Sequence, residues 1–210
     1  MAYQELILFD IGGVLFCDPW ETLLLTPLHG IAARMDLSPA AVSRVGRALW
    51  HSYSLRPSEE RQYWGDLGEA LGVRIPEPLI RDVEDKLLLP NPSAPQLIAK
   101  AASTGASLGV ASNNTSFWYA KQVEKLHIDQ WAEPELVFLS HKLGATKSTP
   151  GRGLFEMVLE RLAKARVILV EDRRKNRDRA ASLGIHPLAY RYDQDAIELP
   201  DFANVIGAAR

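Results

Sequence analysis

The chain has 210 residues, of which 47% are apolar, and this is enough to bury a core and excludes a disordered protein. A formal net charge of −2 provides no field that would attract nucleic acid or an anionic membrane, so we expect neither as a partner. The single cysteine, Cys17, excludes an intramolecular disulfide framework, and no apolar run approaches the roughly 18 residues of a membrane-spanning helix. The first residues, MAYQELILFD, lack the apolar segment of a signal peptide, and we expect a cytoplasmic protein.

Short apolar runs rich in β-branched residues recur along the chain and predict buried strands. These runs are Leu6–Phe9, Leu108–Ala111, Leu136–Leu139, Val167–Val170 and Pro187–Tyr190. Apolar residues at three- and four-residue spacing predict helices between them, with Gly105 and Gly184 as helix stops. The predicted helices are Ala94–Ala102, Ser116–Leu126, Leu154–Ala163 and Asn176–Leu183. Strands that alternate with helices favour an α/β fold, a Rossmann-like core with a parallel sheet covered on both faces.

The stretch from residue 17 to 90 breaks this alternation, because it contains helical patterns and no convincing strand. The patterns predict helices at Thr22–Met35, Ala40–Trp50, Ser58–Leu71 and Pro78–Leu88. Proline-containing segments at Asp18–Trp20 and Leu87–Pro95 bracket the stretch and indicate hinges. We therefore expect an α-helical cap, residues 17–90, inserted into a core of residues 1–16 and 91–210. Such a cap would lie over the carboxyl ends of the strands, where parallel sheets bind ligands.

Polar residues follow the predicted strands at the points where these strands end. Asp10 follows the first strand, Ser112 and Asn113 follow the second, and Glu171 and Asp172 follow the fourth. Ser140 follows the third strand, with Lys147 a few residues later. Since the ends of parallel strands converge on one crevice, we expect these side chains to share a site.

These residue types suit a divalent metal and a phosphate group. A carboxylate on a rigid strand end can attack phosphorus and form an aspartyl-phosphate, which nominates Asp10. The nucleophile and the substrate phosphate are both anions and repel each other unless a cation lies between them. Mg²⁺ prefers carboxylate and carbonyl oxygens, so we expect Asp10, Asp172 and the Gly12 carbonyl as metal ligands. A lysine and a hydroxyl stabilise the transferring phosphoryl group, and Lys147 and Ser112 fit these tasks.

Four motifs in this order resemble the haloacid dehalogenase superfamily, in its subgroup with a helical cap inserted after the first motif. The motifs are FDIGGVL at Phe9–Leu15, GVASNN at Gly109–Asn114, SHKLGATK at Ser140–Lys147 and VEDRRKN at Val170–Asn176. The resemblance spans nearly the whole chain. It implies a Rossmann-like core, a Mg²⁺-dependent aspartyl-phosphate mechanism and, most commonly, hydrolysis of small phosphomonoesters.

The resemblance also implies a role for each matching residue. Asp10 is the nucleophile and a metal ligand, and Gly12 contributes its backbone carbonyl to the metal. In the later motifs the implied substrate contacts are Ser112, Asn113 and Lys147, and the implied metal ligand is Asp172, with Glu171 positioning a metal-bound water.

Gly12 departs from the family pattern, because the resembling phosphatases carry a second aspartate at this position. That aspartate protonates the leaving group and later activates water. General acid–base catalysis typically contributes about 10² to 10⁴ in rate, so its loss would raise the barrier by roughly 3 to 5 kcal/mol. A substrate hydroxyl, a cap residue or water would have to replace it, or the leaving group would have to be acidic, as in an anomeric phosphate.

Three functions are compatible with these residues. The first is a Mg²⁺-dependent phosphatase acting on a small phosphorylated metabolite such as a sugar phosphate, since resembling proteins with glycine here include sugar-phosphate phosphatases. The second is a 2-haloacid dehalogenase, because halide leaves without a proton, although the resembling dehalogenases tend to carry an aromatic residue at the position of Gly12. The third is a weak or inactive relative that binds a phosphorylated ligand or a partner. A monomer and a homodimer both fit the sequence.

Three further expectations concern the surroundings of the site. Ser148 replaces the proline that commonly follows the lysine of the third motif, and we expect looser support for Lys147. The run RRKNRDR at Arg173–Arg179 is expected to form the solvated face of a helix, with contact of Arg173 or Arg174 to an anionic substrate as the alternative. The cap aromatics are expected to pack between the cap helices; they are Trp50, Tyr53, Tyr63 and Trp64.

Overall fold

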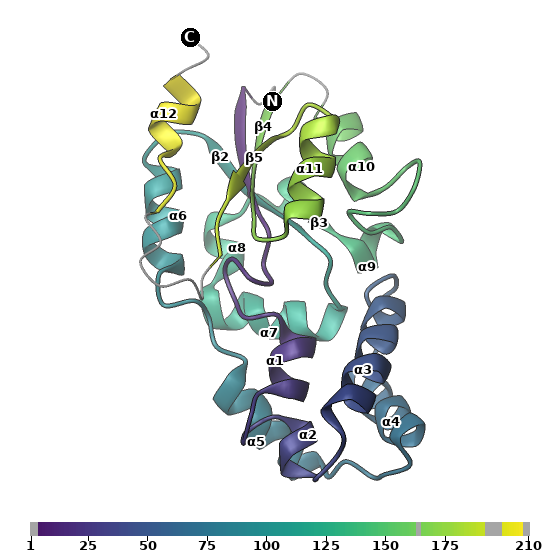
Figure 1. Cartoon of the computed structure of the whole chain (residues 1–210). Helices are drawn as coiled ribbons and strands as arrows, with labels where there is room; N and C mark the ends of the chain where they lie inside the picture. Colours follow the sequence, from purple (N-terminus) through teal and green to yellow (C-terminus); the bar gives the residue numbers. More distant parts are fainter. Residues whose placement is uncertain (1–3, 163–164, 192–198, 208–210) are drawn as a thin grey trace.

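The computed structural model describes residues 4–162, 165–191 and 199–207, and these contain a five-stranded parallel sheet with helices on both faces (Figure 1). The strands are β1 (Glu5–Phe9), β2 (Ser107–Ser112), β3 (Val137–Leu139), β4 (Arg166–Glu171) and β5 (His186–Ala189). Their order across the sheet is β3-β2-β1-β4-β5, so β1 is central. The predicted α/β core is confirmed, and every predicted run overlaps a strand.

Helices that follow the inserted region in the chain cover both faces of the sheet. They are α6 (Ala94–Ala102), α7 (Ser116–Leu126), α8 (Ile128–Trp131), α9 (Ser140–Leu143), α10 (Leu154–Arg161), α11 (Arg174–Ser182) and α12 (Phe202–Gly207). Leu6 and Leu8 of β1 pack in one apolar cluster with α10 and α11, whereas Ile7 and Phe9 pack in another with α6 and α12. Figure 1 shows these two pairs of helices on opposite sides of the sheet. The central strand is apolar from Leu6 to Phe9, as two covered faces require.

The predicted helix bounds agree closely with the structure in this part of the chain. Helices α6 and α7 have the predicted ends, and α11 begins two residues earlier than expected. Helix α10 ends at Arg161, and the last residue of its predicted range, Ala163, lies outside the described residues. Leu136, expected in the third strand, belongs to a short 3-10 turn, η1 (Pro134–Leu136).

The region inserted after β1 is helical, as predicted. It contains α1 (Pro19–Leu25), α2 (Ile31–Arg34), α3 (Pro39–Tyr53), α4 (Glu60–Leu71) and α5 (Glu77–Leu87). The prediction of one continuous helix over Thr22–Met35 is wrong, because the chain turns between α1 and α2. Pro27 has no backbone N–H to donate, and Leu28 has a left-handed φ of 66°, so a helix cannot continue through them.

The two passages between the sheet and the inserted helices lie side by side. Phe16 and Pro90 form an antiparallel bridge, and Asn91 donates its backbone N–H to the Leu15 carbonyl at 2.8 Å. Cys17, next to this bridge, is buried and donates its thiol to the Leu87 carbonyl at 3.2 Å. This geometry suits a hinge, and the division of the chain at residues 16/17 and 90/91 stays a prediction.

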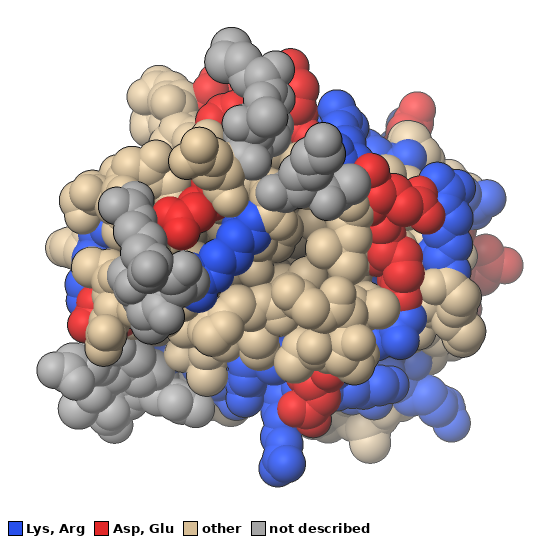
Figure 2. Space-filling view, turned by 90° about the horizontal axis from the view of Figure 1, so that it is seen from above, with Lys and Arg blue, Asp and Glu red and all other residues tan. Residues whose placement is uncertain are grey.

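The surface of the molecule carries charges of both signs. Figure 2, which views the molecule from above in the sense of Figure 1, shows Lys and Arg next to Asp and Glu on the visible face. Within the described part of the chain, no helix has the length and apolar character needed to span a membrane.

Candidate active site

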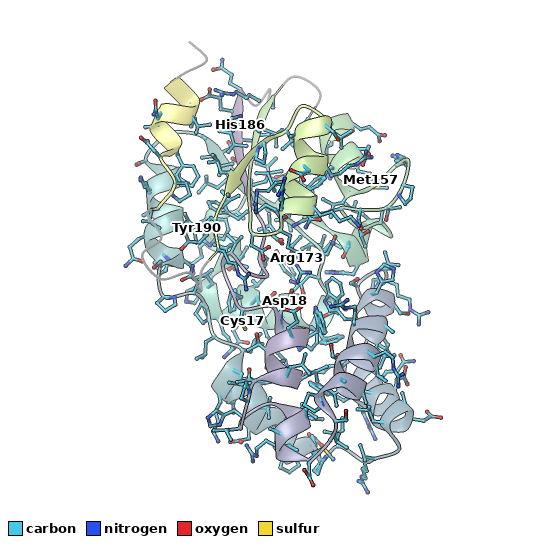
Figure 3. All side chains as sticks on the ribbon, in the orientation of Figure 1. Cys17, Asp18, Met157, Arg173, His186 and Tyr190 are labelled. Atoms are coloured by element: carbon cyan, nitrogen blue, oxygen red, sulfur yellow. The ribbon has the colours of Figure 1, made fainter. Side chains whose placement is uncertain are left out.

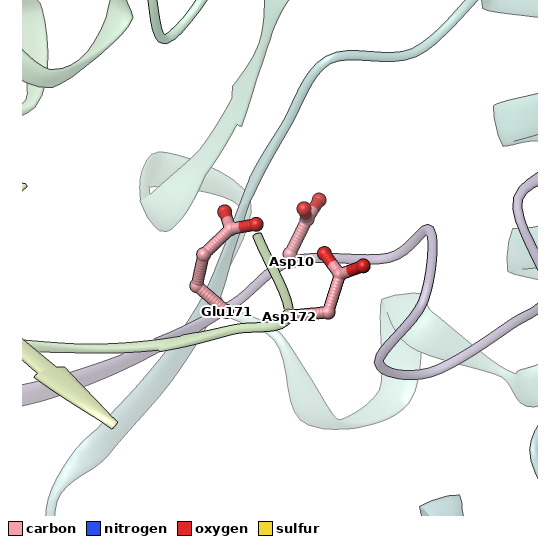
Figure 4. A group of neighbouring side chains, drawn as sticks. All are labelled: Asp10, Glu171 and Asp172. Carbon is pink, nitrogen blue, oxygen red and sulfur yellow. The ribbon is translucent and has the colours of Figure 1, made fainter. Parts of the chain in front are cut away.

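Three carboxylates meet where the central strands end. Asp10 directly follows β1, Glu171 is the last residue of β4, and Asp172 comes next. The strands β1 and β4 are hydrogen-bonded neighbours, and β2 pairs with the other edge of β1. The connections therefore diverge at β1, and such a switch point is where α/β sheets bind ligands. Figure 4 shows the three carboxylates, from the two strand ends, facing a common space.

Asp10 is held by one close ion pair and one backbone hydrogen bond. Its Oδ2 lies 2.6 Å from Lys147 Nζ, and its Oδ1 accepts from the Ile11 backbone N–H at 2.7 Å. Burial and the Glu171 carboxylate, opposed by the Lys147 ammonium, together raise the pKa of Asp10 from 3.8 to about 6. A fixed carboxylate that opens onto a polar cavity can act as a nucleophile.

Lys147 bridges two of the acids from below the cavity. Its side chain is 1% exposed, and its Nζ lies 2.6 Å from Glu171 Oε2 as well as 2.6 Å from Asp10. Burial lowers the pKa of Lys147, but Asp10 and Glu171 outweigh burial and raise it above its usual value. The other oxygen of Glu171 accepts from the Arg173 backbone N–H and from Asn176 Nδ2. Glu171 therefore anchors the lysine, a task that the sequence did not suggest.

The carboxylates are arranged so that a metal ion fits among them. Asp10, Glu171 and Asp172 each offer a carboxylate oxygen, and these oxygens all lie within 4.8 Å of one another. Asp172 Oδ1 is buried and has no hydrogen-bond partner among the described residues, which leaves it available as a ligand. Burial and the nearby Asp10 carboxylate raise the pKa of Asp172. Hard oxygen donors of this kind suit Mg²⁺.

The end of β2 and the loop after it supply one buried hydroxyl and one occupied amide. Ser112 Oγ is fully buried and has no hydrogen-bond partner within the described part of the chain. Asn113 lines the cavity, and its Oδ1 accepts from the Lys147 backbone N–H at 2.9 Å. Ser140 holds the same loop, because its Oγ accepts from the Asn114 N–H at 2.9 Å. Asn113 thus positions the lysine loop, the segment of residues 144–153 that carries Lys147 between α9 and α10, whatever contact it makes with a substrate.

The lysine loop is firmly anchored, so the expected looser support of Lys147 is not found. Besides the bond to Asn113, Thr149 Oγ1 accepts from the Thr146 backbone N–H at 2.8 Å. The Leu154 N–H donates to the Thr146 carbonyl at 3.0 Å and joins the loop to α10. Hydroxyl side chains thus provide the support that a proline commonly gives.

A polar cavity of about 280 Å³ opens above the acids, between the sheet and the inserted helices. It is lined by Asp10, Gly12, Asp18, Pro19, Trp50, His51, Asn113, Asn114, Thr146, Ser148, Arg173, Lys175 and Asn176. The cavity combines the nucleophile candidate with cationic and amide groups, and its volume suits a small phosphorylated molecule.

Asp18 and Arg173 form an ion pair at the rim of this cavity. Figure 3 places both at the junction between the sheet and the inserted helices. Asp18 is the N-cap residue of α1, yet its side chain makes no capping bond and accepts from the Arg173 guanidinium instead. Burial, opposed by Arg173, raises the pKa of Asp18 to about 7. Arg173 and Arg174 are both exposed, as expected for the charged run, but Arg173 also lines the cavity and pairs with Asp18 there.

The cap aromatics divide between two environments. Tyr63 and Trp64 are buried in the apolar cluster of the inserted helices, as predicted, and Tyr53 joins them. Trp50 packs partly against this cluster and also lines the 280 Å³ cavity. The helix α3 therefore brings side chains to the site.

A second and larger cavity, of about 830 Å³, lies between α4, α5 and α7. Its lining includes Lys121, which forms ion pairs with both Glu60 and Glu84. The seven residues predicted to form the site do not line it. We therefore assign the chemistry to the smaller cavity.

Comparisons with known proteins agree with this geometry. No protein-family model and no curated protein matches the chain. A HAD family enzyme from Bacteroides thetaiotaomicron, solved with magnesium and inorganic phosphate, superposes with a TM-score of 0.63 at 16% identity, over 92% of this chain and 97% of that one. A predicted HAD-like family hydrolase from Porphyromonas gingivalis gives 0.67 at 14% identity, over 100% and 99%. The fold is that of the haloacid dehalogenase (HAD) family.

Another HAD structure on which the chain superposes is a dehalogenase. L-2-haloacid dehalogenase from Xanthobacter autotrophicus gives a TM-score of 0.59 at 16% identity, over 97% of this chain and 88% of that one. Structures with the HAD fold thus include more than one type of hydrolase, and the fold by itself does not choose between them.

Within this HAD fold, the structure brings all seven predicted site residues to one end of the sheet. Sequence reasoning missed Asp18, and it considered Arg173 as a surface charge or a contact to an anionic substrate but not as a partner of Asp18. The signal was present in Asp18, an aspartate eight residues after Asp10 in a proline-containing hinge. Nothing in the spacing says that its carboxyl turns away from α1 and toward the cavity.

Proposed function

We propose that the protein is a HAD-type, Mg²⁺-dependent phosphatase that removes phosphate from a small phosphorylated metabolite. The observation that carries the proposal is the cluster at the ends of β1 and β4, where Asp10 meets Lys147 at 2.6 Å beside two further carboxylates. Phosphoryl transfer needs a fixed nucleophile and cations for the developing charge, and these groups supply both.

The side chains of the site divide the work. Asp10 attacks phosphorus through a carboxylate oxygen, and the bond from phosphorus to the leaving oxygen breaks. Lys147 and the unpartnered Ser112 hydroxyl stabilise the charge on the phosphoryl oxygens. Water then attacks the aspartyl-phosphate, releases inorganic phosphate and restores Asp10.

The metal ligands would be Asp10, Asp172 and the Gly12 carbonyl, and Glu171 would hold Lys147 through their ion pair. Bound Mg²⁺ would neutralise part of the charge that the nucleophile and the phosphate bring together. The magnesium and phosphate in the Bacteroides structure support this assignment. The inserted helices would act as a cap that excludes water during the first step.

The proposal is tested with 4-nitrophenyl phosphate and a panel of sugar phosphates, measured with Mg²⁺ and with EDTA. We expect phosphate release that requires Mg²⁺ and that Asp10→Asn lowers by more than about 10³-fold, because the nucleophile is lost. Asp85→Asn is the matched control, since Asp85 is exposed on α5, and it should keep the wild-type rate. Circular dichroism should find all three proteins folded.

Other outcomes would contradict the proposal. Full phosphatase activity in Asp10→Asn would remove Asp10 from the mechanism. Halide release from 2-chloropropionate without metal would favour a dehalogenase, as in the Xanthobacter neighbour. Binding of phosphorylated compounds without turnover would favour a binding protein.

A further inference from the structure

The space beside Gly12 already holds a carboxyl group. A Cβ added to Gly12 would lie 3.6 Å from Asp18 Cγ and 3.8 Å from its Oδ2. Asp18 therefore occupies the volume into which a side chain at residue 12 would extend. Asp10, Gly12 and Asp18 line the same cavity.

The conformation of Asp18 is not explained by its place at the start of α1. Aspartate is a favoured N-cap residue because its side chain accepts from the first backbone N–H groups of the helix. Asp18 gives up this bond, and its carboxyl turns to Arg173 and the cavity. Arg173 is held in turn, because its backbone N–H donates to Glu171 Oε1.

We propose that Asp18 is the catalytic acid and base that the first motif lacks at Gly12. This inference rests on the proposed phosphatase function, and it assigns the proton transfers of that reaction to a residue from the base of the cap. Arg173 is a positioning residue, because it orients the Asp18 carboxyl.

The proton balance of the two steps is simple. In the first step, Asp10 forms a bond to phosphorus, the bond to the leaving oxygen breaks, and the protonated Asp18 gives its proton to that oxygen. An alcohol leaves, and Asp18 becomes a carboxylate. In the second step, Asp18 takes a proton from water as the water oxygen attacks phosphorus. The bond to Asp10 breaks, and both acids return to their starting states.

The test compares wild type with Asp18→Asn on aryl phosphates of graded leaving group, from 4-nitrophenyl to phenyl phosphate. The first step with 4-nitrophenyl phosphate needs no acid, so Asp18→Asn should release one equivalent of nitrophenol in a burst and then turn over about 10² to 10⁴ times more slowly than wild type. Phenyl phosphate should give no burst, because its leaving group needs the proton.

Glu21→Gln is the matched control, because Glu21 lies 3.8 Å from the same guanidinium but does not line the cavity. It should keep wild-type kinetics on both substrates. Both variants remove a partner of Arg173, so Glu21→Gln shows what the loss of such a contact does by itself. If Asp18 had only a structural role, Asp18→Asn would lower the stability and would slow the turnover of both substrates equally, without a burst.

A second variant moves the carboxylate back to residue 12. Asp18→Ala should lose activity as Asp18→Asn does. The double variant with Gly12→Asp should be at least tenfold more active than Asp18→Ala, since the new side chain reaches the vacated volume. One outcome would overturn the role of Asp18 and keep the proposed function. In that outcome Asp10→Asn abolishes the activity, whereas Asp18→Asn and Asp18→Ala keep it within twofold of wild type. A wild type inactive on every phosphate would overturn both.

Discussion

Two adjacent glycines follow the nucleophile candidate, and they have different reasons to be small. Gly13 has a left-handed φ of 77°, and a Cβ added there would lie 2.5 Å from Asp172 Cγ. Gly12 does not have a positive φ, and its added Cβ would make only an ordinary contact with Asp18. The structure therefore requires glycine at residue 13 to leave space for Asp172, the proposed metal ligand, whereas residue 12 has room for a methyl group.

The pair of glycines allows a matched comparison. Gly13→Ala should lower the free energy of unfolding by about 1 to 2 kcal/mol through its left-handed backbone, and it should weaken Mg²⁺ activation by displacing Asp172. Gly12→Ala should change the free energy of unfolding by less than about 0.5 kcal/mol. Urea unfolding and the Mg²⁺ dependence of phosphate release measure both effects. Equal behaviour of the two variants would contradict the reading of Gly13.

The pKa of Asp10 predicts a pH dependence of stability in metal-free buffer. The value is raised from 3.8 to about 6, so the ionised form is less favourable in the folded chain than in the unfolded chain. The contribution of Asp10 to stability is therefore fully present below about pH 4 and is lost as the pH rises through about 6. In the Asp10→Asn variant the side chain at residue 10 has no proton to titrate, so this contribution is absent.

The measurement is urea unfolding in EDTA from about pH 4 to about pH 7. The free energy of unfolding of wild type relative to Asp10→Asn should fall by about 2 to 3 kcal/mol over this range, since one pKa unit corresponds to about 1.4 kcal/mol. A difference that stays constant, or that rises with pH, would show that the strand end does not raise the pKa of Asp10.

At the scale of elements, α7 links the sheet to the inserted helices. Trp118 of α7 is fully buried in the apolar cluster of α1–α5, with its ring centroid 5.1 Å from that of Tyr63. Its indole N–H donates to Glu84 of α5 at 3.2 Å. Ser116 Oγ accepts from the Ser58 N–H and donates to the Ser58 carbonyl. Helix α7 thus provides part of the apolar packing of the inserted helices.

Trp118→Ala tests this link. Removal of a large buried ring should lower the free energy of unfolding by about 3 to 5 kcal/mol. Hydrogen exchange should rise in α4 and α5 as well as in α7, because the ring packs among all three. Trp131→Ala, which removes a ring packed on Phe9 of β1, is the comparison and should leave exchange in α4 and α5 unchanged. Faster exchange confined to α7 in Trp118→Ala would argue against the link.

Element types were easier to predict than the breaks within them. The apolar runs around Leu6 and Val167 became neighbouring strands because β-branched and apolar residues in short runs suit a buried sheet. The single helix expected over Thr22–Met35 failed because Pro27 and Leu28 set a turn that the apolar spacing does not record.

At the scale of the whole molecule, the parallel topology assembles the site. Asp10 and Asp172 are far apart in the sequence, and the pairing of β1 with β4 places their carboxylates within 4.8 Å. Lys147 reaches Asp10 and Glu171 from a loop whose backbone is fixed by Asn113 and by the Thr149 hydroxyl. The cavity above them closes because the inserted α1 and α3 bring Asp18 and Trp50 over the strand ends.

The sequence by itself determined the sheet, the helical insertion and the seven candidate site residues, because apolar periodicity, polar residues after strands and short motifs are local signals. Tertiary structure decided the rest: Arg173 leaves a charged run to meet Asp18, and Glu171 anchors a lysine. Tertiary structure also decided that the Asp18 carboxyl lies beside Gly12. The direction of the Asp18 carboxyl depends on the packing of α1 against the sheet, and no spacing in the sequence encodes that packing.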